Sequence, residues 1–281
     1  MIQLGTTQKL KIVKKVEFGV YLGEEMNAMA SDRILLPSKQ VPIDAAVGDE
    51  ISVFVYRDSK DRMIATTRIP LIQLGEVARL EVAQTINIGA FLSWGLEKDL
   101  LLPYAEQTYR VREGDSVLVA LYLDKSNRLC ATMKLYPYLK KGSPYIVGDI
   151  VKGYAYQDSE NFGIFVAVDD KYQGLIPRKE CYGDIKVGEQ ISARITQVRE
   201  DGKLDLSVRK KAYEQISDDS DKIIDIINSY DGVLPFTDKA TPEVIYRETG
   251  MSKNEFKRAV GHLLKEGKIV KTEKAIRLSG R

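Results

Sequence analysis

Histidine, cysteine and tryptophan are scarce in this chain of 281 residues, which has one histidine, two cysteines and one tryptophan. Catalytic triads and most zinc sites draw on histidine or cysteine. His262 has no serine or cysteine nucleophile beside it, and Cys130 and Cys181 are isolated in or beside apolar segments without CxxC spacing. We therefore expect two reduced thiols and no catalytic residue, metal ion or cofactor.

Long apolar runs are also missing. No run approaches the 18 or so residues of a membrane span, and the N-terminal stretch MIQLGTTQKLKIVKK lacks the apolar core of a signal peptide. These absences predict a cytoplasmic protein without membrane contact.

Neither sign of charge dominates, and the formal net charge is +2. Basic and acidic side chains number 10 and 9 in residues 1–75, 9 and 8 in 76–144, 10 and 11 in 145–210, and 13 and 12 in 211–281. No segment has the bulk basicity of a strong nucleic-acid binder. If the chain binds nucleic acid, few phosphates are neutralised, and base stacking must supply much of the affinity.

What the sequence does contain is a threefold repeat. Three glycines are each followed two residues later by an aromatic residue, and three prolines each follow two aliphatic residues and precede a glycine by 11 positions. Three copies of one five-strand unit, each of roughly 65 residues, predict tandem small domains. The landmarks are Gly19, Gly89 and Gly163, then Tyr21, Phe91 and Phe165, then Pro37, Pro103 and Pro177.

The third copy carries the clearest motif. Phe162 and Phe165 flank Gly163, and a glycine within an apolar strand often marks a bulge. A bulge there would turn both rings to one side of a small sheet, where bases can stack on them; the alternative is that both rings fill the core. The repeat favours exposed rings, at these positions and at Phe18 and Tyr21 of the first copy.

The second copy lacks one of the two rings, because Ile88 stands at the first aromatic position. Trp94 follows Phe91 by three residues and could replace the missing ring or simply pack in the core. Exposure of Phe91 and Trp94 stays open at this point.

Small closed five-stranded barrels of the oligonucleotide-binding class suit such antiparallel units. The third copy resembles S1-type RNA-binding domains in Phe162-Gly163-Ile164-Phe165, Gly174-Leu175-Ile176 and residues 202–207 (GKLDLS), and the first two copies resemble divergent versions. That resemblance implies an RNA face made of the aromatic residues and of polar residues around the last turn. The implied RNA contacts are Phe18, Tyr21, Phe91, Phe162 and Phe165, with the basic turn residues Arg62, Arg128 and Lys203 and, at the acidic position, Asp58, Asp124 and Arg199.

All three copies depart from the S1 pattern where it has a histidine, because Pro37, Pro103 and Pro177 stand there. Each barrel thereby loses one stacking and hydrogen-bonding side chain. The aromatic platform is retained.

The last segment changes to a helical period. Ile223, Ile226 and Ile227 are spaced for a helix over residues 217–229, and a Thr-Pro pair starts a short helix at residue 242. Ser252 and Glu255 form a capping box that opens a third helix to about residue 266, and the apolar residues at 269–270 and 276–278 predict a two-stranded wing. This order is typical of a winged helix.

The third predicted helix has an apolar and a basic face. Phe256, Val260 and Leu263 share one side, and Arg258, Gly261, His262 and Lys265 lie opposite. Residues 251–281 contain nine basic and three acidic residues, which predicts phosphate contacts; a solvated helix face is the alternative. The candidate contacts are Lys257, Arg258, His262, Lys265 and Lys268.

Three barrels followed by a winged helix, and the run MSKNEFKRAVGHLLKEGKI at residues 251–269, resemble the conserved virulence factor B family of bacteria. The resemblance implies RNA binding and post-transcriptional regulation of virulence genes. It also implies a mainly β fold with a small α/β end. We expect S1-like domains at residues 1–72 and 73–140, an S1-type domain at 145–211 and a winged helix at 215–281, with a linker between Tyr136 and Tyr145.

We therefore predict a monomeric, non-enzymatic protein that binds single-stranded RNA. One alternative is a regulator whose winged helix binds duplex DNA or RNA, and another is a scaffold that docks on the ribosome or a nuclease. A metal-dependent nuclease would need converging carboxylates, but no catalytic domain remains beside the four modules.

Overall fold

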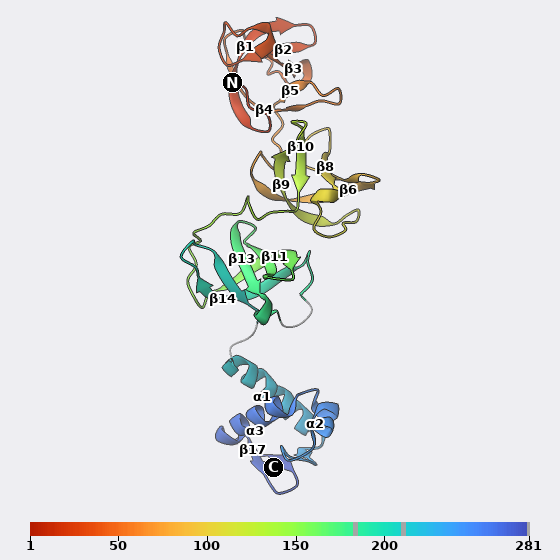
Figure 1. The fold of residues 1–281 in the computed structure, drawn as a ribbon, viewed down its shortest axis with the longest axis vertical. Helices are drawn as coiled ribbons and strands as arrows, with labels where there is room; N and C mark the ends of the chain where they lie inside the picture. Colours follow the sequence, from red (N-terminus) through yellow and green to blue (C-terminus); the bar gives the residue numbers. More distant parts are fainter. Residues whose placement is uncertain (182–184, 209–211, 280–281) are drawn as a thin grey trace. The chain divides into compact units, whose positions relative to one another are not determined.

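The computed structural model describes residues 1–181, 185–208 and 212–279, and for 212–217 the backbone alone. The chain divides into two compact units, residues 1–208 and 209–281. The first contains three five-stranded β domains and the second a winged helix (Figure 1). The predicted domain ends at residues 211 and 281 lie outside the described residues.

The first β domain is a closed barrel in the strand order β1-β2-β3-β5-β4. Its last closure is a parallel pair, with Leu35 of β3 opposite Ile64 of β5. The predicted antiparallel unit thus contains one parallel pair as well, because closing five strands in this order brings β3 and β5 together in the same direction. The strands are β1 (Thr7–Val16), β2 (Gly19–Gly23), β3 (Ile34–Pro37), β4 (Glu50–Arg57) and β5 (Met63–Thr66).

The third β domain repeats this barrel, in the order β11-β12-β13-β15-β14. A parallel pair again closes it, with Leu175 of β13 opposite Asp205 of β15. Its strands are β11 (Ile150–Ser159), β12 (Gly163–Val168), β13 (Tyr172–Pro177), β14 (Gln190–Val198) and β15 (Leu204–Ser207).

The second β domain has the same five strands but is only nearly closed. Its sheet runs β10-β9-β6-β7-β8, and no ladder joins β8 to β10 within the described residues 1–181. The strands are β6 (Val77–Ile86), β7 (Gly89–Ser93), β8 (Leu100–Pro103), β9 (Ser116–Leu123) and β10 (Leu129–Thr132). Short 3-10 helices complete the β domains: η1 (Ala30–Asp32), η2 (Ser38–Gln40), η3 (Tyr104–Glu106) and η4 (Arg178–Glu180).

Alternation along the strands builds each barrel core. In β12, Ile164, Val166 and Val168 are buried, and Phe165 between them is only half-buried. Because successive side chains of a strand point to opposite faces, this pattern leaves one residue in two for the outer face. The outer face of β12 therefore presents Phe165.

Residues 135–142 are packed against the third barrel, which corrects the prediction of a free linker after Tyr136. Leu135 and Leu139 are buried. The amide of Lys140 donates to the Lys171 carbonyl at 2.7 Å, and the amide of Gly142 donates to the Gly202 carbonyl at 2.9 Å. We call residues 135–142 the strap.

Polar and aromatic contacts also join the second and third barrels. The guanidinium of Arg79 bonds both carboxylate oxygens of Asp170, at 2.6 and 2.8 Å, and lies 4.7 Å from the Tyr154 ring centroid. The Tyr154 hydroxyl in turn hydrogen-bonds the Tyr109 hydroxyl. Between the first and second barrels, Phe54 packs edge-on against Trp94, with 5.7 Å between ring centroids.

The winged helix keeps the predicted start and end signals. Ser252 caps α3 in a complete capping box with Glu255, and Gly250 ends α2 in the left-handed conformation. Phe256, Val260 and Leu263 are buried on one face, as the period predicted. The elements are α1 (Ala212–Ser229), β16 (Val233–Leu234), α2 (Pro242–Thr249), α3 (Lys253–Lys265), β17 (Ile269–Lys271) and β18 (Ile276–Leu278).

Two details of this domain differ from expectation. Helix α1 begins five residues before the predicted start at 217, and the wing gains a third strand because β16 pairs with β18. Two-residue strands such as β16 carry too little periodicity to be recognised in a sequence. No helix in the described part of the chain is long and apolar enough to cross a membrane.

Candidate nucleic-acid interface

Gly163 places the rings of Phe162 and Phe165 on one side of the third barrel. Its φ is +117°, and a Cβ atom there would lie 2.1 Å from the carbonyl oxygen of Ile176. This backbone turn brings the two ring centroids to 6.4 Å. The predicted bulge between the two rings was wrong, since the register shift lies in the neighbouring strand, between Ala155 and Gln157.

The same arrangement recurs in the first barrel. The ring centroids of Phe18 and Tyr21 also lie 6.4 Å apart. A Cβ atom added to the intervening Gly19 would lie as close to the Leu36 carbonyl oxygen as one on Gly163 would lie to that of Ile176. Phe18 is 57% exposed and Phe162 is 62% exposed, whereas Tyr21 and Phe165 are half-buried. The first ring of each pair, Phe18 or Phe162, is thus exposed as expected, and the second ring, Tyr21 or Phe165, is only partly exposed.

The last turn of each barrel has one shared hydrogen-bond pattern. In the third barrel the amide of Arg199 donates to the Lys203 carbonyl, and the matching bonds join Asp58 to Arg62 and Asp124 to Arg128. These bonds place the three predicted basic residues, Arg62, Arg128 and Lys203, at equivalent positions.

A groove of about 620 Å³ runs over the outer face of β12, β13 and β15. It brings together the four residues of this barrel that the S1 resemblance implied, Phe162, Phe165, Arg199 and Lys203. The full lining is Tyr136, Gln157, Ser159, Phe162, Phe165, Gln173, Gly174, Leu175, Arg199, Lys203 and Leu204.

Tyr136 is a third ring of this groove that sequence reasoning missed. The strap carries it to the barrel, where its centroid lies 5.6 Å from that of Phe165 in an edge-to-face contact. The ammonium of Lys203 lies 5.6 Å from the Tyr136 centroid. Its only sequence signal is an aromatic residue inside a segment otherwise rich in turn formers.

Carboxylates neutralise the cations beside the groove. Lys203 pairs with Asp201, and the hydrogen bond to that carboxylate raises the pKa of Lys203. Arg199 pairs with Asp205 at 2.7 Å, and that hydrogen bond raises the pKa of the guanidinium. The groove therefore combines apolar rings with little uncompensated positive charge.

Gln173 ties the strap to the lining of the groove. It is 6% exposed, and its amide nitrogen donates to the carbonyls of Tyr136 and Leu139 at 2.7 and 3.2 Å. Its side-chain oxygen is buried and has no hydrogen-bond partner among the described residues. Gln173 therefore supports the groove from below and does not present an exposed acceptor to it.

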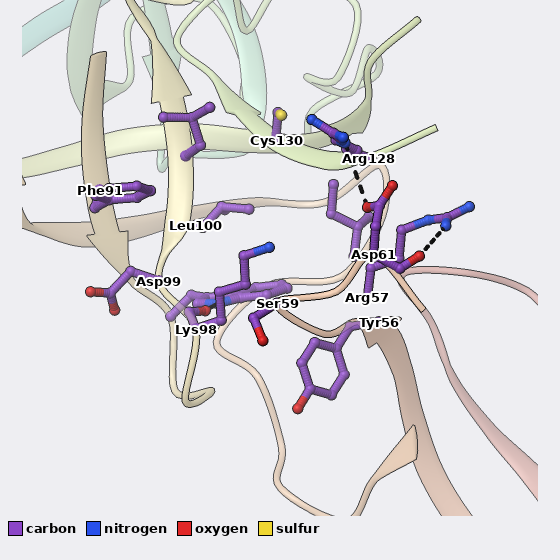
Figure 2. A pocket seen from close by; sticks show the side chains of 13 residues that line it. Tyr56, Arg57, Ser59, Asp61, Phe91, Lys98, Asp99, Leu100, Arg128 and Cys130 are labelled. Atoms are coloured by element: carbon purple, nitrogen blue, oxygen red, sulfur yellow. Dashed lines mark hydrogen bonds and ion pairs between the residues drawn. The ribbon is translucent and has the colours of Figure 1, made fainter. Parts of the chain in front are cut away.

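The other two barrels present their predicted residues differently. In the first barrel, Asp58 holds Arg62 through two bonds of 2.9 and 2.7 Å. In the second barrel, the turn after β4 lines the same cavity as Phe91, and Asp61 of that turn pairs with Arg128 at 3.5 Å (Figure 2). Phe91 is half-buried, as are Tyr21 and Phe165 at the equivalent positions.

Trp94 settles the question left open for the second copy. It is 3% exposed, and its indole nitrogen donates to the Lys98 carbonyl at 2.6 Å. Trp94 is therefore a core residue and does not replace the missing ring at Ile88.

The candidate residues of the winged helix fall into two groups. His262 and Lys268 contact the carboxylate of Glu266, at 3.3 and 2.9 Å. Lys257, Arg258 and Lys265 are exposed on α3 and form no ion pair with any residue of the described ranges. These three side chains are free of ion pairs, but the charges of Lys257 and Arg258 still interact with those of Asp238 and Glu255.

Residues 1–181, 185–208 and 212–279 hold no group of three or more His, Cys, Asp or Glu side chains that could bind a metal ion. Burial raises the pKa of the Cys130 thiol to about 11, which keeps it protonated and a poor nucleophile at neutral pH. Cys181 is half-buried and also free.

Comparisons with known proteins agree with this architecture. An S1 domain model matches residues 4–68 and 74–134, the model of the second domain of virulence regulatory factor CvfB matches 140–210, and a CvfB-like winged helix domain model matches 221–278. A multidomain protein with nucleic acid binding domains from Streptococcus pneumoniae has a similar fold, with a TM-score of 0.50 and 22% identity over 98% of both chains.

Curated relatives match most of the chain. Protein YitL of Bacillus subtilis is 30% identical over 94% of this chain and 90% of its own length. Conserved virulence factor B of Staphylococcus saprophyticus is 31% identical over 81% of both chains, and that of Staphylococcus aureus is 29% identical over 81% of both. With its S1 domains, its barrel order and its winged helix, this chain belongs to the conserved virulence factor B family.

Proposed function

We propose that this protein binds single-stranded RNA through the groove of its third barrel and acts as a regulator rather than an enzyme. The observation that carries the proposal is the convergence of three rings, Tyr136, Phe162 and Phe165, on one groove of about 620 Å³. Unpaired bases stack on such rings, whereas the bases of a duplex are already stacked on one another.

Polar groups in the same groove favour RNA over DNA. Gln157 and Ser159 lie beside the rings. Each can accept a hydrogen bond from a ribose 2′-hydroxyl, the group that distinguishes RNA from DNA.

The winged helix supplies backbone contacts in this proposal. Lys257, Arg258 and Lys265 are exposed and free of ion pairs within the described residues, so binding phosphate breaks no existing bond. His262 and Lys268 contribute less because Glu266 already pairs with both. Membership of the conserved virulence factor B family supports a role in controlling bacterial gene expression after transcription, virulence genes included.

The deciding experiment is fluorescence anisotropy with a labelled single-stranded RNA and the matching DNA, for wild type, Phe162→Ala and Phe18→Ala. Both phenylalanines are more than half exposed and precede equivalent glycines, so both variants are expected to fold. Stacking is worth ~1–3 kcal/mol per base, so Phe162→Ala should weaken RNA binding about 5- to 150-fold.

The Phe18→Ala variant serves as the matched control for the barrel. If that variant keeps full affinity, the RNA contacts the third barrel and not the first. If its affinity falls, the RNA site extends to the first barrel. Unchanged binding of a folded Phe162→Ala variant would reject the groove, and equal affinity for DNA would reject RNA selectivity.

Duplex binding by the winged helix is the second candidate, and the three unpaired cations of α3 favour it. The combined change Lys257→Ala, Arg258→Ala and Lys265→Ala should abolish duplex binding if this candidate is right. If that variant loses duplex DNA binding while Phe162→Ala leaves RNA binding intact, the protein is a duplex-binding regulator instead.

A further inference from the structure

A second cavity lies where the first and second barrels meet, and Figure 2 shows the side chains around it. Its volume is about 310 Å³, at the small end of the range for ligand pockets. One side comes from the β4–β5 region of the first barrel and the other from the second. The lining residues on which the argument turns are Ser59, Asp61, Phe91, Lys98, Asp99 and Leu101.

The cavity lies at the open seam of the second barrel. Leu101 and Cys130 occupy the positions that are joined in the closing parallel pairs of the other two barrels, such as Leu175 with Asp205. No ladder joins β8 to β10 in residues 1–181, so the main-chain donors and acceptors along this seam are not used in a sheet. Such groups need hydrogen-bond partners, which a polar ligand can supply.

The turn between β4 and β5 closes one side of the cavity. The Arg57 guanidinium donates to the Asn127 carbonyl at 3.1 Å and to the Asp61 carbonyl at 2.7 Å, and Asp61 pairs with Arg128. These contacts hold the turn beside the cavity. At about 310 Å³ the cavity has half the volume of the third-barrel groove, which suits a single small ligand.

The floor and the rim of the cavity differ in chemistry. Phe91 of β7 lies opposite Leu101 of β8, which gives an apolar surface for a planar ring. Asp99, in the loop just before β8, also lines the cavity. A carboxylate there accepts hydrogen bonds from an amino group on the edge of a base.

Two cations of the rim, Arg57 and Lys98, have no carboxylate partner within the described residues, and Arg57 is already bound to backbone carbonyls. Arg57, Lys98 and Arg128 face Asp61 and Asp99, and Arg128 is paired with Asp61. Lys98 forms no ion pair with any residue in the described ranges, and in Figure 2 its amine points into the space between Leu100 and Asp61. A free ammonium of this kind binds phosphate as a point charge.

We propose that this cavity binds one nucleoside monophosphate, with the base on Phe91 and Leu101, its amino group on Asp99 and its phosphate on Lys98. A free nucleotide and the phosphorylated end of an RNA chain both supply such a base and phosphate. The proposal does not depend on RNA binding by the third barrel.

The test is isothermal titration of the full chain with cytidine monophosphate, for wild type, Lys98→Ala, Ser59→Trp and Lys125→Ala. Removing a charge-assisted contact should weaken binding at least about tenfold in Lys98→Ala. Ser59 is exposed on the covering turn, so tryptophan there fills the cavity without touching a core. Lys125 is an exposed lysine of the same barrel outside the lining, and its variant should bind like wild type.

Two comparisons identify the base and the source of the ligand. Uridine monophosphate lacks the amino group and should bind more weakly than the cytidine nucleotide. RNA with a 5′-phosphate, compared with the same RNA ending in a hydroxyl and measured in the Phe162→Ala background, tests for chain ends. The proposal is supported if either probe binds and that binding depends on Lys98. It is overturned if neither probe binds saturably, or if Lys98→Ala and Ser59→Trp bind as well as wild type.

Discussion

Gly163 stands at the start of β12 and accepts no larger residue. Its φ of +117° is a conformation that L side chains rarely adopt, and an added Cβ would meet the backbone oxygen of Ile176. Gly261, on the exposed side of α3, has ordinary backbone geometry and open space around it. These two glycines therefore make opposite predictions for the same substitution.

Gly163→Ala should destabilise the third barrel by about 2–3 kcal/mol, because a strained backbone conformation is added to a steric clash. Gly261→Ala should stabilise α3 by about 1 kcal/mol, since alanine is the better helix former. Urea unfolding followed by circular dichroism measures both. A Gly163→Ala variant as stable as wild type would show that the turn at residue 163 tolerates a side chain.

Tyr136 tests the ring that the strap brings to the groove. Tyr136→Ala should weaken single-stranded RNA binding by ~1–3 kcal/mol, whereas Tyr136→Phe, which keeps the ring, should bind within about twofold of wild type. Anisotropy titrations of both variants give the comparison. Equal losses in the two variants would mean that the hydroxyl, and not the ring, contacts the RNA.

Among the elements, the strap determines how the third barrel is completed. It is anchored by two buried leucines and by backbone bonds to residues 171 and 202. The buried side chain of Gln173 also donates to two strap carbonyls. The strap therefore behaves as part of the barrel rather than as a connection between domains.

We expect the amides of Lys140 and Gly142 to exchange with deuterium as slowly as those of β13, because both donate to backbone carbonyls. Amides in a free linker would exchange within the dead time of the experiment. Native-state exchange read by NMR decides between the two, with the amide of Lys39 in the exposed η2 turn as the unprotected reference. Fast exchange at residues 140 and 142 would contradict the packed strap.

Over the whole molecule, positive charge is distributed unevenly between paired and free side chains. The cations of the third-barrel groove, Lys203 and Arg199, are bound to carboxylates. Lys257, Arg258 and Lys265 of α3 have no such partner within the described residues. In the proposed function, stacking and phosphate contact therefore fall in different domains, and the salt dependence of binding separates them.

The logarithm of the RNA affinity should fall with the logarithm of salt concentration with a slope of about −2, as expected for three phosphates on a single strand. Replacing the three α3 cations by alanine should bring the slope close to zero. Phe162→Ala should lower the affinity while leaving the slope unchanged. If Phe162→Ala also changed the slope, the contributions of base stacking and phosphate contact to the affinity would not be separable.

The residue sequence by itself determined the repeat, the barrel class, the winged helix and the position of the paired rings. Those features depend on neighbours within a few residues: strand alternation, the glycine at 163 and the capping box at Ser252 are local properties of the backbone. The same holds for the equivalent basic turn residues, whose hydrogen bonds span only four residues.

Only the tertiary structure decided which predicted faces remain open. Tyr136 reaches the groove because Gln173 binds the strap, and Phe91 faces a cavity because the turn containing Asp61 pairs with Arg128 across from it. The same contacts leave the seam beside Leu101 unpaired. Each of these outcomes joins segments far apart in the chain, and short-range patterns contain no information about which distant segments pack together.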